Sequence, residues 1–391
     1  MAVLNRAAEL QEEVAGWRRT LHGMPELGFD VHKTAEFVAD KLRSFGCDEV
    51  VTGIGRTGVV GLIRGKSAGP TTGLRADMDA LPIAEASGKP WTSATPGKMH
   101  ACGHDGHTAM LLGAAKYLCE TRKFSGQIAV IFQPAEEDGG GGQVMVQDGL
   151  MDRFGISRVF AMHNAPGIPL GQFALRPGAI MAETLEFIIA VTGKGGHAAG
   201  PHRAVDPIVI GAQIVGALQT IVSRNTDPLD NLVLTVTKFH AGTALNIIPG
   251  SAELAGTVRS LRCAVTEETR QRIQAICDGQ AASFGATVQV SFIPSYPVTF
   301  NHAYETRFAQ EVASKVVGVS NVDGDIAPAM GGEDFSYMLQ TRPGAMIWIG
   351  NGDSAGLHNA AYDFDDEAIP YGISYWVELA EAASSLESQD A

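Results

Sequence analysis

In this 391-residue chain, the predicted order of strands and helices changes near residue 185. Near residue 299 it returns to the pattern of the first 184 residues. Before residue 185, apolar runs at 58–63 and 127–132 predict buried strands, and residues 108–118 predict a helix. Strands that alternate with helices are typical of an α/β fold with a mainly parallel sheet. Between residues 185 and 298 the predicted order is βαββαβ, the arrangement of ferredoxin-like domains.

The chain is also too long for one ordinary hydrophobic core, so two domains are expected. We predict an α/β domain made of residues 1–184 plus 299–391, interrupted by a second domain, residues 185–298. Hydrophobic residues make up 45% of the chain and charged residues 18%, as in globular proteins.

Charge and cysteine usage narrow the range of partners and compartments. Lys and Arg number 29 against 43 Asp and Glu, a net charge of −14, and basic runs are lacking. Nucleic acid and anionic membranes are therefore not expected as partners. The five scattered cysteines indicate reduced thiols in a cytoplasm. The first helix is amphipathic, unlike a signal peptide, and no apolar run is long enough to predict a membrane span.

Metal-ligating residue types gather in one short segment. His100, Cys102, His104 and His107 fall within eight residues, and two adjacent carboxylates, Glu136–Glu137, follow about thirty residues later. Thiolate, imidazole and carboxylate together suit a divalent transition-metal ion. A further carboxylate beside such an ion is what metal-assisted hydrolysis needs to deprotonate water.

The spacing of these residues predicts how they face one another. In an extended segment Cys102 and His104 point the same way. Adjacent side chains at 136 and 137 diverge, so one can face a metal and the other its water. His163 and His358 are expected where strands end, and the carboxyl ends of strands form the usual site of an open α/β sheet.

Nine short motifs together resemble the M20 metallopeptidase family, in its aminoacylase, hippurate hydrolase and auxin-conjugate hydrolase branch. The resemblance extends from about Arg18 to Tyr375 and implies a zinc-peptidase type of catalytic domain. The motifs are residues 74–82 (Leu-Arg-Ala-Asp-Met-Asp-Ala-Leu-Pro), 102–107 (Cys-Gly-His-Asp-Gly-His), 133–137 (Gln-Pro-Ala-Glu-Glu), 162–164, 195–199, 246–250, 256–259, 331–335 and 357–359.

The resemblance implies a two-metal site with Glu136 as the general base. Asp77 would hold a ligand imidazole by its second nitrogen. Cys102 would take the bridging place that an aspartate has in other branches, which leaves zinc, manganese, nickel and cobalt open. The implied ligands are Cys102, His104, Glu137, His163 and His358.

The resemblance also implies that the inserted domain is a lid and a dimerisation domain. His197 would stabilise the oxyanion in the partner subunit's active site. Asn246 and Arg259 would bind substrate, with Arg259 suited to an α-carboxylate. Gly331 and Gly332 would line the same pocket. A homodimer or homotetramer is therefore expected.

The predicted reaction is hydrolysis of an N-acyl-L-amino acid to a carboxylic acid and a free amino acid. A dipeptidase or aminopeptidase of the same family is the alternative within this chemistry. Two other hypotheses are a cysteine amidase with Cys102 as the nucleophile and a non-catalytic protein with a structural metal. Several polar residues are expected to pack or to form hydrogen bonds, and Asp334 could be a support of the site or a helix cap. The histidines in this group are His100, His107, His202, His240 and His302.

Overall fold

The computed structural model describes residues 3–383, which divide into two compact units. The first unit contains the chain up to Ile180, Phe300–Ala327, and the chain from Asp334 onward. The second contains Met181–Thr299 and Pro328–Glu333. Gly331 and Gly332, which the sequence assigned to the α/β domain, cluster with the second unit. The predicted domain functions stay predictions.

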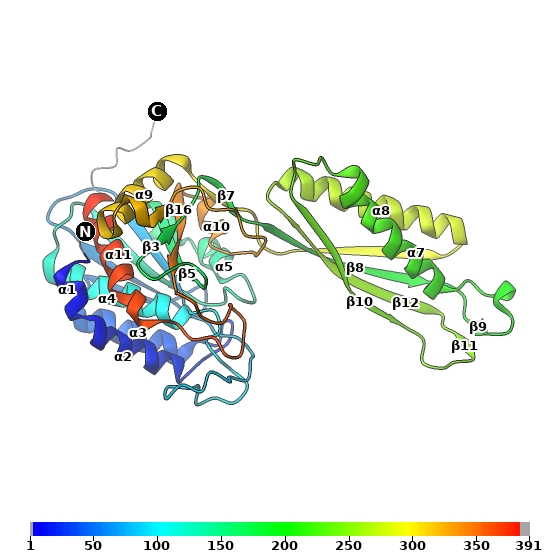
Figure 1. The fold of residues 1–391 in the computed structure, drawn as a ribbon, viewed down its shortest axis with the longest axis horizontal. Helices are drawn as coiled ribbons and strands as arrows, with labels where there is room; N and C mark the ends of the chain where they lie inside the picture. Colours follow the sequence, from blue (N-terminus) through cyan, green and yellow to red (C-terminus); the bar gives the residue numbers. More distant parts are fainter. Residues whose placement is uncertain (1–2, 384–391) are drawn as a thin grey trace. The chain divides into compact units, whose positions relative to one another are not determined.

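The first unit is built on an eight-stranded sheet whose central strands are parallel, which confirms the predicted fold class (Figure 1). The central strands β3 and β16 are buried along their whole length, as expected for strands covered on both faces. Antiparallel pairs join β1 to β2, β2 to β4 and β16 to β6. In spatial order the strands are β1 (Glu49–Ile54), β2 (Gly58–Arg64), β4 (Gln127–Gln133), β3 (Thr71–Asp77), β5 (Ile156–Ala165), β16 (Gly344–Gly350), β6 (Phe173–Ala174) and β15 (Val322–Asp323).

Helix α4 (His104–Thr121) is the central helix of this unit. It packs against β3 and β5 and against four other helices, α1, α2, α3 and α11. Its glycines permit close packing, because a Cβ at Gly106 would lie 2.4 Å from the Phe364 ring. The other helices are α1 (Asn5–Glu9), α2 (Gln11–His22), α3 (His32–Phe45), α5 (Gly141–Gln147), α6 (Leu150–Arg153), α9 (Ala303–Val317), α10 (Ser336–Leu339) and α11 (Ile369–Ala383).

The parallel run β4-β3-β5-β16 brings four carboxyl ends to one edge of the sheet. Asp77 ends β3, and Glu136 follows β4 closely. His163 lies near the end of β5, as predicted, whereas the prediction that His358 follows a strand directly is wrong, because His358 lies in a turn of the loop after β16. Residues that are far apart in the sequence are therefore collected at the usual ligand edge of an α/β sheet.

The second unit has the predicted βαββαβ order, and its sheet order β10-β12-β8-β13 is antiparallel throughout. Burial alternates along β8 and β12, so one face of the sheet is covered, by α7 and α8 (Figure 1). A small pair, β9 with β11, extends from this sheet. The elements are β8 (Glu183–Thr192), β9 (Gly196–His197), α7 (Pro207–Thr220), β10 (Leu232–Ala241), β11 (Ile247–Ile248), β12 (Ser251–Ser260), α8 (Cys263–Phe284) and β13 (Thr287–Pro294).

One described helical segment, Pro207–Asn225, is long and apolar enough to cross a membrane by length and composition. A core helix can meet the same criteria. Here Ile210, Ile214 and Leu218 are fully buried against the sheet and α8. One face of the segment thus packs against the core of the second unit, while Ile208, Val209 and Val222 are exposed.

Candidate metal centre

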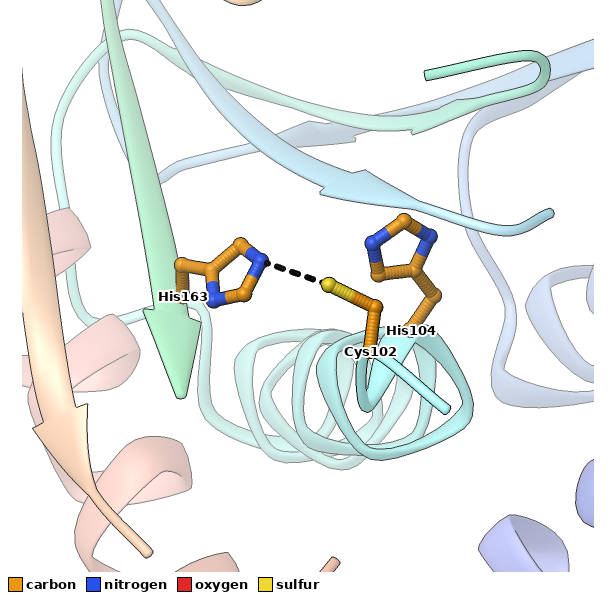
Figure 2. Close-up of side chains that lie close together, drawn as sticks. All are labelled: Cys102, His104 and His163. Atoms are coloured by element: carbon orange, nitrogen blue, oxygen red, sulfur yellow. Dashed lines mark hydrogen bonds between the residues drawn. The ribbon is translucent and has the colours of Figure 1, made fainter. Parts of the chain in front are cut away.

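Cys102 and His104 are placed by a left-handed turn at the start of α4. Gly103 has φ of +90°, and a Cβ there would lie 2.3 Å from the Asn164 amide, so the turn requires glycine. The expected extended conformation is therefore wrong, because the helix begins at His104 itself. The Cys102 thiol nevertheless faces the His163 ring (Figure 2), with Sγ 3.5 Å from Nε2.

His163 is held in the tautomer that a metal ligand needs. Its Nδ1–H donates to the Asn164 carbonyl oxygen at 2.7 Å, which leaves the Nε2 lone pair toward Cys102. Burial lowers the pKa of His163 well below its usual value, and the nearby His107 ring adds to this effect. A neutral imidazole with a fixed second nitrogen is the form that binds metal ions.

The two adjacent glutamates are fixed through their backbone by a residue that the sequence analysis did not single out, Asp79. Its carboxylate accepts the Glu136 N–H at 3.0 Å and the Glu137 N–H at 3.1 Å. Ala135, just before them, has φ of +55°, an uncommon conformation for a residue with a side chain. In the sequence, the signal that could have identified Asp79 was its position inside the motif of residues 74–82.

His104 lies within a shell of carboxylates. Its Nδ1 is 3.4 Å from Asp79, and its Nε2 is 3.8 Å from Asp77 and 3.9 Å from both Glu136 and Glu137. The ring is fully buried, and within the described chain neither nitrogen makes a well-formed hydrogen bond. Burial disfavours the charged ring, but these carboxylates outweigh it and raise the pKa of His104 to about 10.

His358 completes the group from a loop. Its Nε2 lies 3.3 Å from Glu137 Oε1, and its backbone N–H donates to the Ala101 carbonyl at 2.8 Å. The residue has φ of +61°, so the loop is held in an uncommon conformation at this point. Burial opposes ionisation of Glu137, but the close contact with His358 outweighs it and lowers the pKa of Glu137.

The donor set fits divalent cations. Among the described residues, five groups place their ligand atoms within 4.8 Å of one another. Three of them consist of Glu136 and the implied ligands: Cys102–His104–His163, Cys102–Glu137–His358 and His104–Glu136–Glu137. Burial and the charges of Glu137 and Glu136 raise the pKa of the Cys102 thiol well above its usual value. Buried negative charge is unfavourable unless positive charge lies nearby, and bound metal ions would supply that charge to the carboxylates around His104.

Asp77 contacts a different imidazole from the one expected. Its Oδ1 accepts the Nδ1–H of His107 at 2.7 Å, while the His107 Nε2 accepts the Asn164 N–H at 2.9 Å. Both nitrogens of His107 are thereby used, as predicted for a hydrogen-bonded histidine. His107 is outside the implied ligand set. Within that set, the nitrogen close to Asp77 is His104 Nε2, which lies 3.8 Å from Asp77 Oδ2. Arg75, 2.8 Å from Asp77 Oδ2, helps to hold its pKa well below the usual value against burial.

Asp334 supports the site rather than capping its own helix. Its carboxylate accepts the Gly142 N–H at 2.7 Å, the Gln133 amide at 2.7 Å and the Arg75 guanidinium at 3.0 Å. Arg75 also donates to Gln133 at 2.9 Å. This buried network ties the ends of β3 and β4 to the start of α5, directly behind the two glutamates.

The predicted substrate residues lie in the second unit, in two places. His197 and Asn246 are brought together by the β9–β11 pair, where the Ala198 N–H donates to the Asn246 carbonyl at 3.0 Å. Arg259 lies near the other end of β12, a ten-residue strand that spans about 30 Å. Gly331 accepts the Ala182 N–H at 2.9 Å. At Gly332 a Cβ would lie 2.5 Å from the Thr184 side chain.

A mainly parallel sheet with thiol, imidazole and carboxylate groups at one edge defines a metal-dependent hydrolase. Residues 73–382 match peptidase family M20/M25/M40, and the chain belongs to this family. The predicted resemblance and the predicted class of reaction, hydrolysis of carbon–nitrogen bonds, are thereby confirmed.

Individual relatives cover nearly the whole chain. It is 40% identical over 380 residues to hippurate hydrolase of Campylobacter jejuni, which covers 97% of this chain and 99% of the relative. It is 36% identical over 364 residues to N-acetylcysteine deacetylase of Bacillus subtilis, with 93% and 94% covered. The solved structure of a dinuclear metal-binding peptidase of the M20 family from Bacillus subtilis is 31% identical, with a TM-score of 0.85 and 97% and 99% covered.

Proposed function

We propose that the protein is a cytoplasmic, metal-dependent amidohydrolase that cleaves N-acyl-L-amino acids to a carboxylic acid and a free amino acid. The observation that carries this proposal is the group of thiol, imidazoles and carboxylates at one sheet edge, which is buried except at Glu137 and His358. The similarity of the chain to a hippurate hydrolase and an N-acetylcysteine deacetylase favours an N-acyl amino acid as substrate. Five free cysteines favour a reducing compartment.

Five residues would hold two divalent cations, and zinc, manganese, nickel and cobalt all suit the mixed donor set. The neutral Nε2 of His163 and the hydrogen-bond-free nitrogens of His104 support this assignment. The cations would supply Lewis acidity, which acidifies water and polarises the acyl carbonyl. The ligands would be Cys102, His104, Glu137, His163 and His358.

Glu136 would be the general base. It is buried beside the ligand cluster, and its backbone is fixed by Asp79. The carboxylate takes a proton from the attacking water and returns it to the leaving amine. The predicted divergence of the two side chains is wrong, because both carboxylates lie 3.9 Å from His104 Nε2. Glu137 would bind metal, and Glu136 beside it would handle the proton.

In the second unit, Arg259 and Asn246 would bind the substrate, and His197 would stabilise the oxyanion. Arg259 is half-buried, and within residues 3–383 its guanidinium makes no salt bridge. Burial lowers the pKa of Arg259, so a substrate α-carboxylate would replace lost solvation. His197 is exposed, and its Nδ1 accepts the Ala199 N–H at 3.0 Å. The proton is therefore on Nε2, which is free to donate to an oxyanion.

The separation of these residues supports a dimer with shared sites. His197 and Asn246 lie at one end of β12 and Arg259 near the other, about 30 Å away along the ten-residue strand. A single small substrate cannot contact both ends. We infer that Arg259 and the His197–Asn246 pair serve two different active sites, with His197 acting in the site of the partner subunit. A homodimer is the smallest assembly that satisfies this arrangement.

The electrostatics favour metal catalysis over a cysteine nucleophile. A catalytic cysteine requires a low thiol pKa and a nearby positive charge. Burial and two carboxylates act in the opposite direction on Cys102. A peptidase activity on small dipeptides is the second candidate, favoured by the likeness to a dinuclear peptidase.

The test is release of free amino acid from a panel of substrates by the purified protein. The panel contains N-acetyl, N-benzoyl and indoleacetyl amino acids and dipeptides, each assayed as isolated, after chelation, and after addition of zinc, manganese, cobalt or nickel. We expect loss of activity on chelation and recovery with metal. Hydrolysis that survives verified removal of metal would contradict the proposal.

The matching variant is Glu136→Gln, with Asp138→Asn as the control because Asp138 is adjacent and exposed. We expect Glu136→Gln to retain bound metal and to lose about 10²- to 10⁴-fold in kcat, the usual contribution of general base catalysis. Near-normal turnover with full metal content would remove Glu136 from the role of base.

A further inference from the structure

Two cysteines outside the metal centre form a thiol pair. Cys47 and Cys119 are separated by 72 positions in the chain, yet their sulfur atoms lie 3.6 Å apart. Both side chains are half-buried and both are free thiols. Cys47 follows the end of α3, and Cys119 lies in the last turn of α4. The fold therefore creates a contact that scattered cysteine positions do not predict.

Arg122 fixes the backbone around this pair. The residue follows α4, and its guanidinium donates to the Gly46 carbonyl at 2.9 Å and to the Asp48 carboxylate at 2.6 Å. It also donates to the Arg64 carbonyl at 2.9 Å. Residues on both sides of Cys47 are thus attached to the end of the helix that carries Cys119. The two thiols are held near each other without any covalent bond between them.

The contact between the two sulfur atoms favours ionisation of one thiol of the pair, because the remaining S–H can donate to the resulting thiolate. The positive charge of Arg122 lowers the thiol pKa at both cysteines, although burial opposes this effect. A thiol with thiolate character beside a second thiol is the arrangement of a reactive cysteine and its resolving partner.

We propose that Cys47 and Cys119 are a hydroperoxide-sensitive dithiol that closes to an intramolecular disulfide. The thiolate of one cysteine attacks the peroxide, the O–O bond breaks, and a sulfenic acid forms on that cysteine with release of water or alcohol. The sulfur of the other cysteine then attacks the oxidised sulfur, and the sulfenic oxygen leaves as water. Two thiols are oxidised by two electrons, and one hydroperoxide is reduced by two electrons.

The disulfide would raise the stability of the folded protein and leave the metal centre unchanged. Cys119 lies fifteen residues along α4 from His104, about 22 Å along the helix axis. The cross-link closes a long loop that includes β1, β2 and β3, which restricts the unfolded chain. We therefore expect oxidised protein to unfold at a higher temperature and to keep its metal.

The experiment treats reduced, metal-loaded protein with an equimolar amount of hydrogen peroxide. Remaining thiols are then alkylated, and peptides are mapped by mass spectrometry without reduction. We expect a linked peptide pair containing Cys47 and Cys119, the loss of two titratable thiols, and a rise in the unfolding midpoint that dithiothreitol reverses. In Cys47→Ser we expect no linked pair.

Cys263→Ser is the matched control, because Cys263 is exposed and belongs to the other unit. It should leave the linked pair and the rise in the midpoint unchanged. Oxidation confined to Cys102 or Cys263, with Cys47 and Cys119 still reduced, would overturn the proposal. Peptide mapping of the unmutated protein decides this even if a variant fails to fold.

Discussion

Asp79→Asn tests the most specific claim about the candidate metal centre, that one carboxylate fixes the backbone of both functional glutamates. The two oxygens of Asp79 accept the amides of Glu136 and Glu137 at 3.0 and 3.1 Å. Asparagine keeps one acceptor and places an NH₂ group against the other N–H. One buried amide is then left without a partner while the volume is unchanged.

The expected magnitude follows from these two hydrogen bonds. A hydrogen bond to a charged group contributes about 1.5–3 kcal/mol, and a buried unsatisfied N–H costs about the same. Loss of one bond at the turn that carries Glu136 should thus cost about 2–3 kcal/mol. If the turn must be ordered in the transition state, kcat falls by about 30- to 150-fold.

The assay is steady-state hydrolysis of the best N-acyl amino acid, with metal content measured on the same preparation. We expect kcat to fall while KM changes little, because Asp79 contacts the glutamate backbone and not the substrate. Asp138→Asn, an exposed neighbour, should resemble the unmutated protein. A folded Asp79→Asn protein with full metal and kcat within threefold of the unmutated value would refute the reasoning.

Two further predictions concern the partner subunit and pH. His197→Ala and Glu136→Gln should each be nearly inactive, and mixing them after subunit exchange should restore about a quarter of normal activity, because half of the dimers then hold one complete site. No recovery in confirmed mixed dimers would place each site within one subunit. Separately, Asp105 and Glu85 outweigh burial and raise the pKa of His22 to about 9. Because the folded pKa lies above the unfolded value of 6.5, this stabilisation, about 3 kcal/mol, is full below about pH 6.5 and lost as pH rises through about 9. Urea unfolding of His22→Gln should therefore differ from the unmutated protein at about pH 6 and much less above pH 9. An equal difference at both pH values would contradict the raised pKa.

Local patterns were enough to predict the elements that position the site. Apolar runs predicted β2 and β4, and the periodic segment 108–118 predicted most of α4. The residue types of Cys102, His104 and Glu136–Glu137 identified metal-assisted hydrolysis, since few other chemistries use that combination. These features depend on side chains close in the sequence, so the chain alone reveals them.

Relations across the sheet and between distant segments were decided only by the tertiary structure. Asp79 binds the backbone of Glu136, fifty-seven positions away, and Asp77 binds His107 instead of an implied ligand. Cys47 meets Cys119 because Arg122 joins two chain segments. The start of α4 at His104 depends on the space that Asn164 leaves for Gly103. Residue types therefore determined which chemistry the chain can perform. Packing decided which groups bind, support or approach one another, because hydrogen bonds and burial depend on distances in space that no local pattern specifies.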